Sequence, residues 1–105
     1  NLPWNSPEKI DQNIADLRAG GVPFMLGEFG DRELVEDGNA VDHLHLMQAA
    51  QETGIGWITW SWKGNGGATR VLDMSDSYGK VRLTRRGHEI VDGPYGLKAT
   101  SRRIP

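Results

Sequence analysis

The chain has 105 residues, which corresponds to at most one domain with a modest core. Its 37% hydrophobic and 25% charged residues are typical of a globular protein rather than a disordered chain, and the absence of cysteine excludes disulfides and thiol chemistry. A formal net charge of −2 indicates neither a nucleic-acid nor a membrane partner, and the basic residues near the C-terminus are predicted to lie on a solvated surface: Arg85, Arg86, Lys98, Arg102 and Arg103.

The first predicted element is a helix. Ser6 is a typical N-cap and Pro7 suits the first helical position. Ile10, Ile14 and Leu17 then recur at helical spacing and form one apolar stripe, and the Gly-Gly pair that follows ends the helix.

A continuous apolar run over residues 22–26 predicts a strand that is covered on both faces. The run stops at the segment 27–30, which carries Glu28 between glycines. A polar stretch then ends in Asp-Gly-Asn at 37–39, which is expected to cap a second helix closed by Gly54, with an apolar stripe of Val41, Leu44, Met47 and Ala50.

The second predicted strand covers residues 55–62, and an irregular stretch, 63–82, follows it. Thr84 is expected to cap a short helix through Val91, which Gly87 weakens. Residues 93–105 are predicted to form an irregular tail of this single segment, 1–105.

Strands that alternate with amphipathic helices predict an α/β fold built from parallel βα units. Two strands alone make no sheet that is covered on both sides. The chain is therefore expected either to contribute two βα units to a larger barrel or sheet, or to associate with other chains.

Glu28 follows a buried strand and lies where ligand sites form in parallel α/β folds, at the carboxyl ends of the strands. A carboxylate in an apolar setting has to be paired, protonated or functional. The pattern leaves two interpretations open: a catalytic or binding carboxylate, or a structural ion pair with Arg or Lys.

Three of the four tryptophans lie within the second strand or at its end. Ile58, Trp60 and Trp62 share one face by their alternation, and Trp57 points the other way into the packing. Exposed indole rings bind the C–H faces of sugars as well as nucleobases, and the scarcity of nearby Lys and Arg favours sugar. A strand that simply packs a core is the alternative.

Lys63 and Asn65 lie in the glycine-rich stretch that follows and are candidates for hydrogen bonds to hydroxyl groups, although a plain turn explains the glycines equally well. The stretch lacks the Gly-Lys-Ser/Thr end of a phosphate-binding loop. His43 and His45 point away from each other on a helix and have no third ligand at metal spacing. We expect no metal and no cofactor.

Four stretches carry a resemblance to a known family: PFMLGEFG (23–30), GWITWSWKGNGG (56–67), LDMS (72–75) and LTRRGHEIVDGPYGLKATS (83–101). Over nearly its whole length the chain resembles the C-terminal third of a glycoside hydrolase family 5 enzyme, closest to bacterial endo-β-1,4-mannanases and similar to cellulases. The resemblance implies a partial TIM (β/α)8 barrel, from helix 6 to helix 8, that other chains or self-association complete.

The resemblance also implies roles for residues. Glu28 would be the nucleophile of a retaining hydrolase and Trp60 would stack on the sugar at the point of cleavage, with Trp62, Lys63 and Asn65 at the border of the cleft. The family's acid/base Glu follows an Asn, and the chain contains no Asn-Glu pair. Activity on a β-linked mannan or glucan therefore requires the rest of the barrel. A non-catalytic carbohydrate-binding or oligomerising half-barrel is the alternative. The resemblance further implies secretion.

Overall fold

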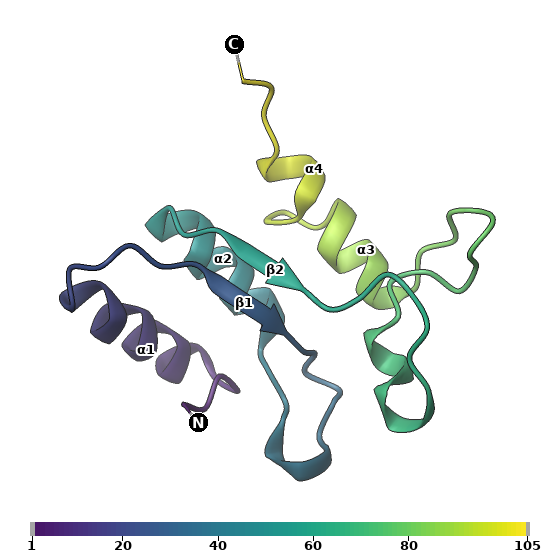
Figure 1. Cartoon of the computed structure of the whole chain (residues 1–105), viewed down its shortest axis with the longest axis horizontal. Helices are drawn as coiled ribbons and strands as arrows, with labels where there is room; N and C mark the ends of the chain where they lie inside the picture. Colours follow the sequence, from purple (N-terminus) through teal and green to yellow (C-terminus); the bar gives the residue numbers. More distant parts are fainter. Residues whose placement is uncertain (1, 105) are drawn as a thin grey trace. The chain divides into compact units, whose positions relative to one another are not determined.

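The computed structural model describes residues 2–104 and divides into two compact units, Asn1–Trp60 and Ser61–Pro105. The first unit contains, in chain order, α1 (Pro7–Ala19), β1 (Leu26–Phe29), the 3-10 turn η1 (Glu36–Gly38), α2 (His43–Thr53) and β2 (Trp57–Thr59) (Figure 1). The second contains the 3-10 helix η2 (Gly67–Leu72), α3 (Arg85–Asp92) and the short helix α4 (Leu97–Thr100). No helix in the described residues is both long and apolar enough to cross a membrane.

Helix α1 begins where the sequence predicts. The Ser6 hydroxyl accepts a hydrogen bond from the Lys9 amide at 3.3 Å, and Pro7 occupies the first turn. Ile10 and Ile14 are buried in the core of the first unit, whereas Leu17, the third residue of the predicted stripe, remains 39% exposed near the end of the helix.

Strand β1 lies later in the chain than the predicted strand at 22–26. Val22 and Met25, which the apolar run places in a covered strand, are 70% and 56% exposed. Pairing begins at Leu26, whose amide donates to the Gly56 carbonyl at 2.9 Å. The strand begins at Leu26 because its hydrogen-bonding partner, the segment that leads into β2, begins only at Gly56. Strand β2 is likewise shorter than the predicted 55–62.

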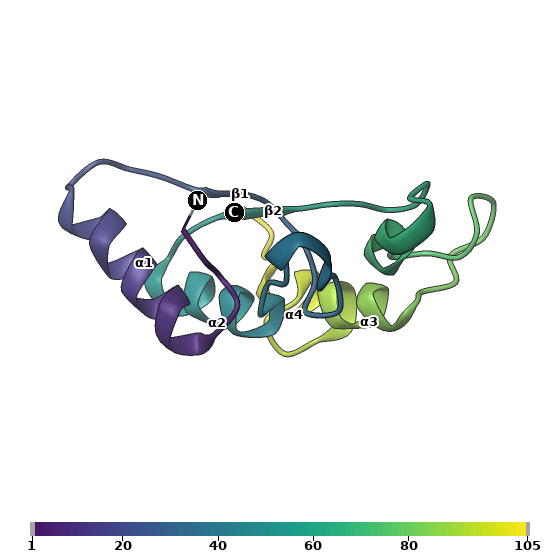
Figure 2. The same ribbon diagram turned by 90° about the horizontal axis from the view of Figure 1, so that it is seen from below.

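The two strands are parallel, as predicted, with Leu26 beside Trp57 and Glu28 beside Ile58, and a bulge lies between Leu26 and Glu28. Both α1 and α2 lie on one side of this sheet (Figure 2). Leu26 and Phe29 are buried toward the helices, where Phe29 meets the edge of the Trp57 ring at 5.6 Å between centroids. The described residues of the first unit provide no second helical layer, so the opposite face of the sheet is open.

Helix α2 is capped by Asp42 and not by the Asp-Gly-Asn at 37–39. The Asp42 carboxylate accepts from the His45 amide at 3.1 Å, while Gly38 adopts a φ of 70° in η1, a turn of its own. The buried face also differs from the prediction. Leu44 is 40% exposed, whereas Met47 and Ala50 are buried as predicted and are joined by others: His43, Leu46 and Ala49. Gly54 ends the helix with a left-handed φ of 71°.

The second unit is built around the segment 72–76. The amides of Met74 and Ser75 both donate to the Trp62 carbonyl at 2.9 Å, and on the other side Ser75 forms an antiparallel bridge with Leu83. Trp62, which the sequence places at the end of the second strand, is therefore not part of β2; its backbone pairs with the segment 72–76.

Helix α3 is capped by Thr84, as predicted. Gly87 is not merely a weak point in this helix, because a Cβ there would lie 1.9 Å from the Met74 carbonyl oxygen. Arg86 is only 1% exposed, so the prediction of a solvated side chain is wrong at this position. The segment 93–105, predicted to be irregular, contains α4.

Candidate functional site

Glu28 lies on the open face of the sheet. Glu28 points to the side opposite its neighbour Phe29, and the bulge after Leu26 allows Leu26 to share the buried side with Phe29; Glu28 and its partner Ile58 are both exposed. Within residues 2–104 the Glu28 carboxylate makes no hydrogen bond or ion pair. The described chain therefore contains no Arg or Lys partner of the kind that a structural ion pair requires.

Trp60 follows β2 directly and is 47% exposed, as is Ile58 at 48%. Their alternation with the half-buried Trp57 agrees with the predicted face pattern. Extended strands lie about 4.8 Å apart and rise about 3.3 Å per residue, which places the Trp60 Cα about 8 Å from the Glu28 Cα. One carboxylate and one indole therefore share the open face, at the carboxyl ends of two adjacent strands.

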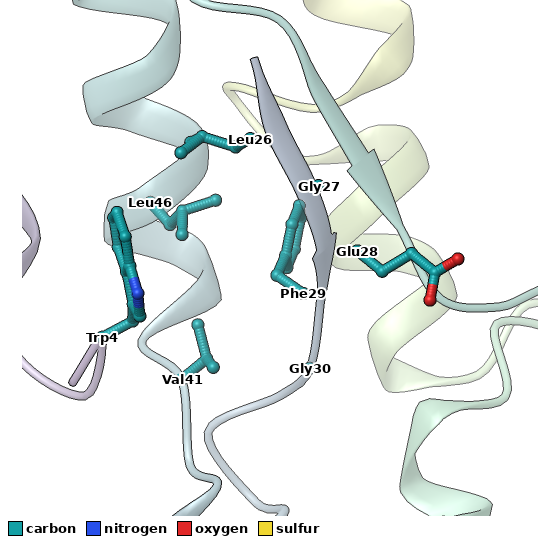
Figure 3. A pocket seen from close by; sticks show the side chains of 8 residues that line it. All are labelled: Trp4, Leu26, Gly27, Glu28, Phe29, Gly30, Val41 and Leu46. Atoms are coloured by element: carbon teal, nitrogen blue, oxygen red, sulfur yellow. The ribbon is translucent and has the colours of Figure 1, made fainter. Parts of the chain in front are cut away.

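An apolar hollow of about 220 Å³ lies on the other side of β1, between the strand, α2 and the N-terminal segment. Trp4, Phe29, Val41 and Leu46 line it, while the Glu28 carboxylate points away from it (Figure 3). The hollow therefore belongs to the layer between sheet and helices, and the chemistry of Glu28 belongs to the open face.

Sequence reasoning did not predict the burial of two polar residues, Asp31 in the loop after β1 and His43 at the start of α2. Asp31 and His43 are both fully buried, and His43 Nε2 lies 3.5 Å from Asp31 Oδ2. The Arg32 amide donates to His43 Nδ1 at 3.2 Å, and Asp31 Oδ1 accepts from the Glu33 amide at 2.9 Å. These contacts fix the turn after β1. The position of Asp31 directly after the GEFG segment was the available signal.

Trp62, Lys63 and Asn65 lie in the second unit. Trp62 is 41% exposed. The polar groups of Lys63 and Asn65 already have partners within the protein. The backbone N–H and the side-chain nitrogen of Asn65 donate to Asp73 Oδ1 at 2.9 Å and 2.7 Å, and Lys63 Nζ lies 3.7 Å from Asp73 Oδ2. Lys63 also lies 5.5 Å from the centroid of the Tyr78 ring. Within the described residues, no three His, Asp or Glu gather as metal ligands would.

Comparison with known proteins identifies the family of this chain. Residues 2–66 match the family model described as cellulase, glycosyl hydrolase family 5. A mannan endo-1,4-beta-mannosidase of Streptomyces lividans is 44% identical over 94% of this chain and 25% of its own length. A mannan endo-1,4-beta-mannosidase of Salipaludibacillus agaradhaerens is 39% identical over 93% of this chain and 28% of its own length.

Solved structures agree. The catalytic domain of mannanase from Streptomyces sp. SirexAA-E superimposes with a TM-score of 0.83 at 30% identity and covers 96% of this chain and 31% of its own. The mannohexaose complex of Thermomonospora fusca beta-mannanase gives 0.77 at 31% identity, over 94% and 31%. The chain thus spans about a quarter of its curated relatives and about a third of these structures. Its fold is a partial TIM barrel, and the chain belongs to glycosyl hydrolase family 5.

Proposed function

We propose that this chain supplies the nucleophile, Glu28, and a sugar-stacking ring, Trp60, to a retaining endo-β-1,4-mannanase. The observation that supports it most is their common position on the open face of a parallel sheet, at the strand ends where barrel enzymes carry out their chemistry. Mannan is the preferred substrate because the relatives are named as mannanases, and one of them is described in complex with mannohexaose.

The chemistry of the proposal requires two carboxyl groups, roughly 5–5.5 Å apart in retaining enzymes. Glu28, exposed and without an internal partner, attacks the anomeric carbon, and the second group donates a proton to the departing oxygen; water then releases the sugar from Glu28. Asp31 does not meet the requirement for the second group, because it is fully buried and its Oδ1 is occupied by the Glu33 amide. Because the chain also contains no Asn-Glu pair of the kind that carries the family's acid/base, the proposal takes the acid from outside this chain.

We further propose that additional strands pair with the edges of this two-stranded sheet and complete the barrel, either from a complementing segment or from further copies of this chain. The apolar residues left exposed along the sheet support this, since Ile58 and Trp60 lie side by side on it. A polymeric substrate is cut outside the cell, so secretion is part of the proposal.

Two alternatives differ from this proposal in testable ways. A cellulase-like enzyme would use the same two residues on β-glucan. A non-catalytic carbohydrate-binding piece would depend on the Trp60 ring but not on the Glu28 carboxylate. The occupied side chains of Lys63 and Asn65 count against a binding role for those two residues, because their polar groups already have partners.

The test is a chimera in which this chain replaces the corresponding C-terminal part of the Streptomyces lividans relative, which supplies the rest of the barrel. We expect hydrolysis of β-mannan, and we expect Glu28→Gln to reduce kcat at least about 10⁴-fold without preventing folding. Glu33→Gln, an exposed carboxylate five residues further on, is the matched control and should retain turnover within about twofold. Full turnover by Glu28→Gln would refute the role of the nucleophile, and turnover of β-glucan alone would favour the cellulase alternative.

A further inference from the structure

Asp73 is a buried carboxylate to which no role has been assigned. It is 5% exposed and follows η2 directly. Its Oδ1 atom accepts from the Asn65 amide and from the Asn65 side chain, whose nitrogen also donates to the Ser61 hydroxyl at 2.9 Å. With Lys63 facing Oδ2, one carboxylate holds several points of the loop that surrounds Trp62.

The backbone around Asp73 is itself fixed. The Thr84 hydroxyl donates to the Asp73 carbonyl at 2.6 Å, and the Thr84 amide donates to the Met74 carbonyl at 3.0 Å. The amides of Met74 and Ser75 hold the Trp62 carbonyl. Asp73 therefore contacts both parts of the unit: its backbone carbonyl binds the Thr84 cap of α3, and its carboxylate binds the loop that follows Trp62.

Two aromatic rings of the second unit are exposed: Trp62, in this loop, and Tyr78, which the Lys63 ammonium contacts. Trp62 is 41% exposed and Tyr78 is 77% exposed, and the Lys63 ammonium lies between the Asp73 carboxylate and the Tyr78 ring. The polar groups of the loop face inward, toward Asp73, and the ring of Trp62 is what the loop presents outward. Such an arrangement presets a ring for sugar at little conformational cost on binding.

We propose that Asp73 is a positioning residue: it fixes the loop 61–67 so that the Trp62 ring is held ready to stack on the sugar chain. This inference rests on the proposed function. It requires a charged carboxylate at Oδ2, because that oxygen faces the Lys63 ammonium, and neither a protonated oxygen nor an amide NH2 group can accept from it; Oδ1 accepts both donors from Asn65.

The protonation state of Asp73 agrees with this requirement. Burial raises the pKa of Asp73, but the hydrogen bonds from Asn65 and Gly64 and the charge of Lys63 outweigh burial, so the pKa lies below its ordinary value of 3.8. The carboxylate is therefore charged at neutral pH, and the loop is expected to lose its anchor only as the pH falls below that value.

The experiment uses the full chain labelled with 5-fluorotryptophan, in which the four indole signals are assigned by replacing each Trp in turn with Phe. In Asp73→Asn, which keeps the size of the side chain but removes its charge, we expect the Trp62 signal to move or broaden. Asp76→Asn is the matched control, because Asp76 is an exposed carboxylate three residues away, paired with Arg82. It should leave the Trp62 signal unchanged.

Two further readouts separate positioning from general stability. The wild-type Trp62 signal should shift as the pH falls below 3.8, and this titration should be absent in Asp73→Asn. Measured in the barrel-completing chimera, the mannohexaose dissociation constant should be about tenfold higher with Asp73→Asn and unchanged with Asp76→Asn. The proton signals of His88 in α3 report whether the second unit is folded.

Should Asp73→Asn unfold that unit, Asn65→Ala decides the question, because it removes the side-chain donors and leaves the Thr84 contact with Asp73 intact. A Trp62 signal that is the same as wild type in the folded variant would overturn the proposal. So would undiminished mannohexaose affinity. If mannohexaose moves no indole signal in the barrel-completing chimera, the proposed function fails, and the Trp62 signals of the variants of the isolated chain still decide whether Asp73 anchors the loop.

Discussion

Substitution of Gly87 by alanine tests the packing of the second unit, because the structure and the helix propensity predict opposite changes in the free energy of unfolding. An alanine in a helix is ordinarily more stable than a glycine by about 1 kcal/mol, so sequence reasoning alone predicts a gain. In the structure, a Cβ at this position would lie 1.9 Å from the Met74 carbonyl oxygen and 3.1 Å from the Leu83 Cβ. A carbon and a carbonyl oxygen approach no closer than about 3.3 Å, so the two segments have to separate by more than about 1 Å.

That separation has a cost that exceeds the helix gain. The Thr84 amide would lose its 3.0 Å hydrogen bond to the Met74 carbonyl, at about 1 kcal/mol, and overpacking costs about 1–3 kcal/mol more. We therefore expect Gly87→Ala to lower the free energy of unfolding by about 1–3 kcal/mol, measured by urea denaturation of the chain. Gly79→Ala is the control, since a Cβ there meets no atom within 4 Å. A stabilised Gly87→Ala variant would refute the close approach of α3 to Met74.

Three other predictions concern the site and the assembly. Mannohexaose should quench tryptophan fluorescence, and Trp60→Ala should remove most of the response while Trp57→Phe retains it; a response that survives in Trp60→Ala would argue against stacking. The isolated chain should sediment as an oligomer because one face of its sheet is open, and a well-folded monomer would contradict this. Because the pKa of Asp73 is lowered on folding, its contribution to stability is fully present above pH 3.8 and is lost as the pH falls through the pKa of the folded state. Urea denaturation at several pH values should show this loss of stability in the wild-type chain. An equal loss in Asp73→Asn would exclude Asp73 as its source.

Local signals in the sequence predicted the elements that local chemistry determines. Ser6 and Pro7 predicted the start of α1, and Thr84 predicted the cap of α3, because a cap depends on a few neighbouring residues. The limits of the strands were not predictable in this way. The apolar run at 22–26 looks like a strand, but its backbone has no partner before Leu26, and pairing depends on a segment thirty residues away.

In the candidate site, too, the features set by local geometry were predictable and those set by distant contacts were not. The alternation of Trp57, Ile58 and Trp60 follows from strand geometry and agrees with the observed exposure. The internal roles of Lys63 and Asn65 were not visible, because they depend on Asp73, a residue that reaches them only through the fold. The burial of Arg86 was not predictable either. Arg85 and Arg86 are adjacent and identical in type, so the sequence gives no sign that one of them is buried.

The nucleophilic role of Glu28 is tested most directly by trapping the covalent intermediate. The barrel-completing chimera is incubated with a 2-deoxy-2-fluoromannosyl fluoride, whose fluorine slows release of the sugar from the enzyme, and the modified peptide is then identified by mass spectrometry. We predict a single fluoromannosyl group on the peptide that contains Glu28, on the carboxylate itself, and none in Glu28→Gln. A sugar attached to a different carboxylate, or an active chimera that is not modified at Glu28, would contradict the account.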